Sequence, residues 1–175
     1  MQPAQLRFAL LFAALSCLLL GLYAFPYREL GLSETWFEGY LGAYARLVGK
    51  VLACFESGVH VNGTLVTGRY SLRIVKTCDA MEANALFAAA VLALAGPWLR
   101  KLGALVVGLG ALVAANVLRI LTLYYAGALA PGAFRVLHEE VWPLVLIAFA
   151  AAAFTLAARY VRRGAPLGPE AGAPT

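Results

Sequence analysis

The chain has 175 residues, of which 62% are apolar and 13% are charged, and its formal net charge at pH 7 is +5. A soluble globular domain is about half apolar and about a quarter charged, so this composition argues against one. It also excludes a disordered chain, a collagen and a disulfide-rich scaffold. The mean hydropathy of +0.79 indicates an integral membrane protein.

Four apolar segments are long enough to cross a bilayer, which takes about 20 residues, with a range near 17–25. They are Phe8–Phe25, Ala83–Leu99, Leu102–Tyr125 and Val141–Ala158. Each is expected to be a helix, because lipid cannot hydrogen-bond an exposed backbone. We therefore predict an all-α integral membrane protein with four transmembrane helices. It forms a single membrane domain over 1–163, and the Gly-, Ala- and Pro-rich tail 164–175 is expected to be disordered.

Basic residues near the span ends predict the orientation. Arg7 precedes the first span, Arg100 and Lys101 lie between the second and third, and Arg159 is followed by further arginines after the fourth. These places share one face, so we predict cytoplasmic N- and C-termini in the cytoplasmic (inner) membrane. The first segment also has features of a signal peptide, but its apolar run continues to Phe25, which favours a retained span. The loop 27–79 then lies outside, although its own basic residues argue in the other direction.

The outer loop 27–79 is too long for a passive connector, and its pattern predicts local structure. Apolar residues recur at helical spacing from Trp36 to Leu52, which predicts an amphipathic helix on the membrane surface or across the bundle. Asn62-Gly63 between alternating apolar residues predicts a small β-hairpin. A strand-like run then leads through Ile74 to Cys78.

Three polar or reactive residues do not fit a passive helical bundle. Cys78 precedes the second predicted span, Arg119 lies inside the third, and His138 precedes the fourth. In the predicted topology they lie at similar depth near the outer face, since Arg119 is about 9 Å below the outer end of its helix. A thiol, a guanidinium and an imidazole brought together could form a nucleophilic cysteine site, with the imidazole accepting the thiol proton.

Neighbouring residues have supporting roles in this hypothesis. Asn116 lies on the same helix face as Arg119, where it could orient the guanidinium or donate to an oxyanion. Glu139 is placed to steer the imidazole of the preceding residue. Asp79, followed by Glu82, is predicted to cap the second span, which would hold the cysteine at the positive end of a helix dipole.

Each candidate also has a purely structural explanation. Cys78 could be a small buried residue, Arg119 could extend to the outer surface, and His138 could be an interfacial loop residue. Cys54 could form a disulfide with Cys78 in an oxidising compartment, which would block the nucleophile. The convergence of three separate segments favours the catalytic interpretation.

These segments resemble the exosortase/archaeosortase membrane transpeptidases, in the compact four-span form. The matching pieces are Thr77-Cys78-Asp79-Ala80-Met81-Glu82, Asn116-Val117-Leu118-Arg119-Ile120 and His138-Glu139, within about Ile74–Arg159. The resemblance implies that Cys78, Arg119 and His138 are catalytic. Many members of the family carry a small Ser/Ala-Gly pair after the cysteine, whereas Asp79-Ala80 follows it here.

The resemblance also implies a function. Such an enzyme removes a C-terminal sorting signal, made of a short motif, a membrane helix and a basic end, from exported proteins. It passes them through a thioester on Cys78 to an acceptor amine or to water. The implied partners are these substrates and the lipid bilayer, with no cofactor, metal or nucleic acid.

Two other function classes stay open. A non-enzymatic membrane assembly or scaffold protein would use the same polar residues to join helices. A quinone-linked thiol oxidoreductase needs closely paired thiols, whereas Cys17, Cys54 and Cys78 are far apart in the sequence.

Overall fold

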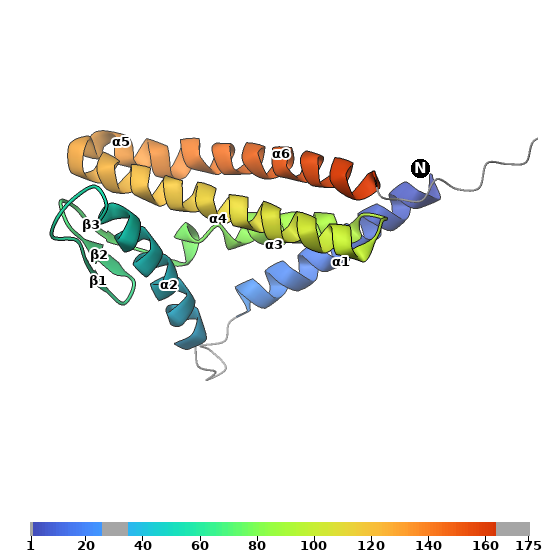
Figure 1. Ribbon diagram of the computed structural model, residues 1–175, viewed down its shortest axis with the longest axis horizontal. Coiled ribbons are helices and arrows are strands. Elements are labelled where there is room, and N and C mark those ends of the chain that lie inside the picture. Colours follow the sequence, from blue (N-terminus) through green and yellow to red (C-terminus); the bar gives the residue numbers. More distant parts are fainter. Residues whose placement is uncertain (1, 26–34, 164–175) are drawn as a thin grey trace, which may run out of the picture.

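The computed structural model describes residues 2–25 and 35–163 (Figure 1). The described elements are mainly helical: α1 (Pro3–Ala24), α2 (Thr35–Leu52), the 3₁₀ turn η1 (Lys76–Cys78), α3 (Met81–Ala93), α4 (Trp98–Leu129), α5 (Pro131–Val136), the π-helical segment η2 (Leu137–Val141) and α6 (Trp142–Arg162). The three short strands are β1 (His60–Asn62), β2 (Leu65–Thr67) and β3 (Ser71–Arg73). The predicted disordered tail 164–175 lies outside the described residues.

Three helical stretches are long and apolar enough to cross a membrane: Pro3–Ala24, Trp98–Leu129 and Pro131–Arg162. They correspond to the first, third and fourth predicted spans, with the first helix ending one residue before Phe25, which indicates a membrane-associated protein. The second predicted span, Ala83–Leu99, is different. Its helix, α3, has only 13 residues and ends at Ala93. It ends there because Gly96 adopts a φ of 154° and Pro97 starts the next helix as its N-cap, so the chain reverses earlier than the apolar run suggests.

Helices α4 and α6 run side by side along the long axis, α1 crosses them obliquely, and the small elements gather at one end (Figure 1). The sheet, α2 and α5 lie at that end, whereas the start of α1, the turn between α3 and α4, and the end of α6 lie at the other. Close packing between α3 and α4 depends on Gly108, where an added Cβ would overlap the ring of Phe87. The basic residues from which we predicted one cytoplasmic face belong to the start of α1, the start of α4 and the end of α6. These all lie at the end of the molecule opposite the sheet.

The loop before α3 folds into the predicted helix and hairpin, and a third strand, β3, adds to the hairpin. Strands β1, β2 and β3 form an antiparallel sheet in sequence order, with Val61 opposite Val66 and Val66 opposite Leu72. The hairpin turn is centred on Gly63 and Thr64, one residue later than Asn62-Gly63 suggested, and Gly63 has the positive φ of 58°. Both the hairpin and the following strand-like run are thus β structure.

Helix α2 buries one side against α4 and the sheet rather than standing alone. Its buried residues join the sheet, η1 and α4 in one core cluster: Leu41, Tyr44, Ala45, Val48, Leu52, Val66, Ile74, Cys78, Val117, Ile120 and Tyr124. Arg46 and Lys50 on its other side are exposed. The hydroxyl of Tyr124 donates to Glu56, which also pairs with Arg69 at 3.3 Å. This packing fixes the loop, and with it the segment that carries Cys78, on α4.

Candidate functional site

Cys78 ends the short η1 turn directly before α3, and its backbone is held in place. The residue is buried, with 8% of its surface exposed. Its N–H donates to the Val75 carbonyl at 2.8 Å, and its own carbonyl accepts a hydrogen bond from Asn116 Nδ2 at 2.9 Å. Asn116 therefore fixes the backbone of the cysteine, a role different from the predicted orientation of Arg119 or donation to an oxyanion.

The start of α3 differs from the prediction that Asp79 is its N-cap. The N-cap is Ala80, which adopts the left-handed conformation with φ 53° and ψ 24°. Asp79 still satisfies an orphan N–H of the helix, because its Oδ1 accepts from Met81 N at 2.9 Å. Cys78 thus lies two residues before the helix cap, and the aspartate carboxylate occupies the helix N-terminus. This geometry explains why a glycine two residues after the cysteine would suit the backbone better than Ala80.

We expect Ala80→Gly to stabilise the protein. The left-handed region costs a residue with a Cβ about 1–2 kcal/mol, part of which is offset by the greater freedom of glycine in the unfolded chain. A net gain of about 1 kcal/mol would raise the thermal midpoint in detergent by about 2–4 °C. The matched control is Ala83→Gly inside α3, which should lower the midpoint. An unchanged or lower midpoint for Ala80→Gly would show that the left-handed backbone carries no strain.

Asp79 is buried within a polar contact to α1. Only 1% of its surface is exposed, and the Tyr23 hydroxyl lies within hydrogen-bonding distance of both carboxylate oxygens, at 3.2 and 3.3 Å. The same hydroxyl lies 2.8 Å from the Lys76 carbonyl, and Lys76 Nζ donates to the Tyr23 carbonyl at 2.8 Å. Burial raises the pKa of Asp79, and the hydrogen bonds from Met81 and Tyr23 only partly oppose it. The cluster ties α1 to the segment that carries the cysteine.

This raised pKa predicts a pH-dependent stability. The folded state holds the Asp79 proton more tightly than the unfolded state does, so stability decreases as pH rises above about 4 and through the folded-state pKa. Asp79→Asn keeps a carbonyl oxygen for Met81 N–H and removes the buried charge. We expect a flatter dependence of the thermal midpoint on pH and a higher midpoint at neutral pH. Parallel curves for the wild type and the Asp79→Asn variant between pH 4 and 8 would contradict this.

His138 lies beside the cysteine. Its Nε2 is 3.8 Å from Cys78 Sγ, although 60 positions separate the two residues. The imidazole lies in the π-helical segment η2 and stacks on Phe134, with ring centroids 5.8 Å apart and planes at 18°. Single π-turns inside helices occur often at functional sites. Glu139, predicted to steer the imidazole, is exposed but interacts with it electrostatically, and the ring of Phe134 supplies a direct contact.

We expect His138→Gln to lower the reactivity of the Cys78 thiol. The imidazole can accept the thiol proton and favour the thiolate, which is the reactive form. The rate of alkylation of Cys78 by iodoacetamide at neutral pH should fall by at least about tenfold. Mass spectrometry of the labelled peptides measures this rate, and exposed Cys54 provides the internal reference. Equal rates in both proteins would show that the imidazole does not activate the thiol.

Arg119 supplies a buried cation next to the cysteine and histidine. It is 6% exposed, and its Nε has no hydrogen-bond partner among the described residues. It interacts electrostatically with Cys78, Asp79 and His138. A guanidinium carries five N–H donors. A buried guanidinium whose donors lack partners is energetically costly. The Nε–H of Arg119 is therefore a donor unused by the described residues, on a cation that interacts electrostatically with both Cys78 and His138.

The structure therefore brings together the three residues predicted from separate segments, and the other cysteines lie apart. Cys17, Cys54 and Cys78 are all free, and Cys17 and Cys54 are exposed. A groove of about 490 Å³ lies between α4 and α6, lined by residues such as Gly103, Gly108 and Ala153, away from the cysteine. Among residues 2–25 and 35–163, no cluster of His, Cys, Asp and Glu could hold a metal ion.

Sequence reasoning missed two contributors to this site. Tyr23 anchors Asp79, and Phe134 stacks on His138. Tyr23 had a detectable signal, because tyrosines are enriched where spans meet the membrane interface, but its partner could not be inferred. Phe134 precedes the histidine by one helical turn, a spacing that would have suggested contact had the segment been recognised as helical.

Comparison with known proteins identifies no relative: no protein family, curated protein or solved structure matches the chain.

Proposed function

We propose that the chain is a membrane cysteine protease and transpeptidase that removes a C-terminal membrane anchor from exported proteins. The observation that carries the proposal is the pair formed by Cys78 Sγ and His138 Nε2, 3.8 Å apart and contributed by separate elements. The buried guanidinium of Arg119 beside this pair adds the third group that such chemistry needs. The likeness to exosortases and archaeosortases in the residues around these positions supports the same function.

The proposed reaction has two stages. His138 accepts the proton of Cys78, and the thiolate attacks the carbonyl carbon of a substrate peptide bond. The carbonyl oxygen becomes an oxyanion, which Arg119 stabilises as the C–S bond forms. The C–N bond then breaks, and His138 returns the proton to the leaving amine of the anchor segment. An acceptor amine or water attacks the resulting thioester and releases the cysteine.

In this proposal, four helices cross the cytoplasmic membrane and the cysteine site lies at the outer face. The two termini and the turn between α3 and α4 are then cytoplasmic. The basic residues Arg7, Lys101 and Arg159 support this orientation, since they come from the end of the molecule opposite the sheet. An anchor helix that lies beside the bundle could then present its peptide bond at the depth of the cysteine without leaving the membrane.

The acyl-enzyme provides the direct test of the proposal. Membranes containing the active protein are quenched in acid, and the peptides that contain Cys78 and Cys54 are examined by mass spectrometry. We expect a substrate-derived acyl group on Cys78 that hydroxylamine releases, and none on Cys54, which is also free and more exposed. Removal of C-terminal anchors without any adduct on Cys78 would overturn the thioester mechanism.

A further inference from the structure

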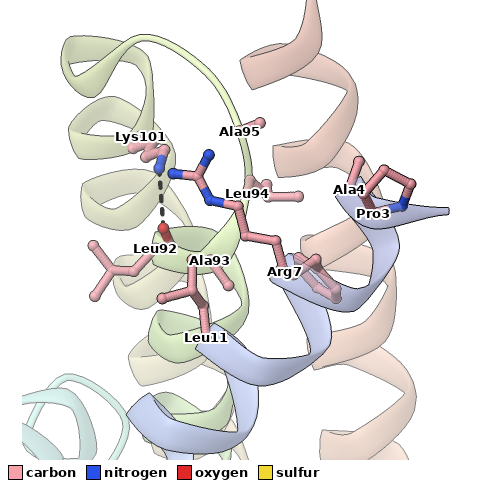
Figure 2. A pocket seen from close by; sticks show the side chains of 10 residues that line it. Pro3, Ala4, Arg7, Leu11, Leu92, Ala93, Leu94, Ala95 and Lys101 are labelled. Carbon is pink, nitrogen blue, oxygen red and sulfur yellow. Dashed lines mark hydrogen bonds between the residues drawn. The ribbon is translucent and has the colours of Figure 1, made fainter. Parts of the chain in front are cut away.

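A cavity of about 460 Å³ lies at the end of the molecule opposite the cysteine, between the first turns of α1, the end of α3 and the start of α4. Two cationic side chains reach it from different helices: Arg7 from α1 and Lys101 from α4. In Figure 2 the guanidinium of Arg7 extends from α1 toward Lys101, whose ammonium points to the Leu92 carbonyl. The other described residues of the lining are apolar, and none of them is acidic.

The two like charges repel each other, and an anion bound between them would offset that repulsion. The donors for such an anion are present. Lys101 Nζ uses one hydrogen bond on the Leu92 carbonyl at 3.0 Å, which leaves two of its three donors. The guanidinium of Arg7 offers a planar fork that suits phosphate oxygens.

The surroundings favour an anion in two further ways. Helices α1 and α4 begin at this cavity with the positive ends of their dipoles, and α3 ends there with its negative end, where Lys101 binds the Leu92 carbonyl. The acidic residues of the described helices lie elsewhere, on α2, the beginning of α3 and η2. Below the two cations, Leu11 and Leu92 supply apolar surface along the wall of the cavity. The lining thus combines cations with hydrocarbon contacts, as a phospholipid requires.

We infer that this cavity binds a phosphate group, carried by an anionic glycerophospholipid or free in solution. The phosphate lies between Arg7 and Lys101 and neutralises their repulsion. With a phospholipid, the acyl chains follow the apolar surface of α1 and α3 into the membrane. The site is separate from the cysteine and does not depend on the proposed reaction.

The test compares lipid retention in the full-length protein. The protein is equilibrated in vesicles of equal parts phosphatidylglycerol and phosphatidylcholine, extracted in detergent and examined by native mass spectrometry. We expect retained phosphatidylglycerol to exceed phosphatidylcholine, by about fivefold for each cation that contacts the phosphate. The preference should disappear in the double variant Arg7→Gln/Lys101→Gln, in which the glutamine amide introduced in place of Lys101 can still donate to the Leu92 carbonyl.

Two controls separate the cavity from general surface charge and from misfolding. Arg162→Gln removes an exposed cation from the same end of the molecule, outside the cavity, and should retain the preference. Arg7→Lys/Lys101→Arg retains both charges and should also retain it. The cavity is not the binding site if the double variant Arg7→Gln/Lys101→Gln keeps the preference for phosphatidylglycerol, or if Arg162→Gln abolishes it.

A second arm distinguishes the source of the phosphate. Inorganic phosphate is added to delipidated protein in detergent, and the thermal midpoint is measured. Stabilisation of the wild type but not of the Gln double variant, without a preference for phosphatidylglycerol, would assign the site to soluble phosphate. A wild type that shows neither lipid preference nor stabilisation by phosphate would overturn the inference.

Discussion

Cys78→Ala is expected to abolish removal of C-terminal anchors in the native host. Loss of a catalytic nucleophile lowers turnover by up to about 10⁶-fold, so processed products should fall below detection. The measurement is a map of the C-termini of exported proteins by mass spectrometry, in the wild-type and mutant strains. A set of proteins should keep hydrophobic, basic-ended tails only in the mutant. Those tails would also reveal the recognition motif.

The matched control for this variant is Cys54→Ala, which removes a free and exposed thiol between α2 and β1 in the chain. It should leave every C-terminus as in the wild type. If Cys78→Ala also leaves them unchanged, while the protein is folded and present in the membrane, the cysteine mechanism is wrong. The scaffold interpretation would then be preferred.

Arg119→Met is expected to lower turnover by about 10²–10³-fold, the usual effect of losing one donor to an oxyanion. The substrate is a tail-bearing protein found in the Cys78→Ala strain, and its rate of processing is measured. The folding stability of the variant, in contrast to its turnover, should not fall. Because Arg119 is buried and its Nε has no partner among the described residues, an apolar side chain of similar length should preserve or raise the thermal midpoint.

Arg119→Lys and Arg135→Met distinguish catalysis from a general charge effect. Lysine keeps the charge but lacks the planar fork, so it should restore only part of the lost rate. Arg135 is an exposed cation on α5 near the same end of the molecule, and its replacement should leave the rate unchanged. If Arg119 has only a structural role, the Arg119→Met variant should show a lower thermal midpoint together with normal turnover.

The helices that the sequence predicted most reliably are those with long apolar runs, since length and hydropathy alone define them. The apolar run of Ala83–Leu99 was misleading because hydropathy does not register chain reversal. Gly96 and Pro97 end α3 early while the apolar character continues into α4. The hairpin was predicted because glycine at a turn has a local signature, although its register moved by one residue.

The convergence of Cys78 with His138 and Arg119 followed from topology, because alternating spans bring their ends to common faces. The details of the site required long-range contacts that no local pattern encodes. Asn116 binds the cysteine carbonyl across two elements, and Tyr23 reaches Asp79 from the first helix. The π-helical turn Leu137–Val141 around His138 departs from the α-helical repeat, and sequence periodicity does not reveal it.

The short third helix has a consequence for how the membrane itself acts on this protein. Thirteen residues of α-helix extend about 20 Å, whereas the hydrocarbon core of a bilayer is about 30 Å thick. In the proposed orientation, α3 ends at the cytoplasmic boundary, so its start and Cys78 lie about 10 Å inside the outer boundary, or the bilayer thins around them. Hydrophobic mismatch at α3 thus couples the depth of the thiol to membrane thickness, so lipid composition would control how readily water and acceptor amines reach the thioester.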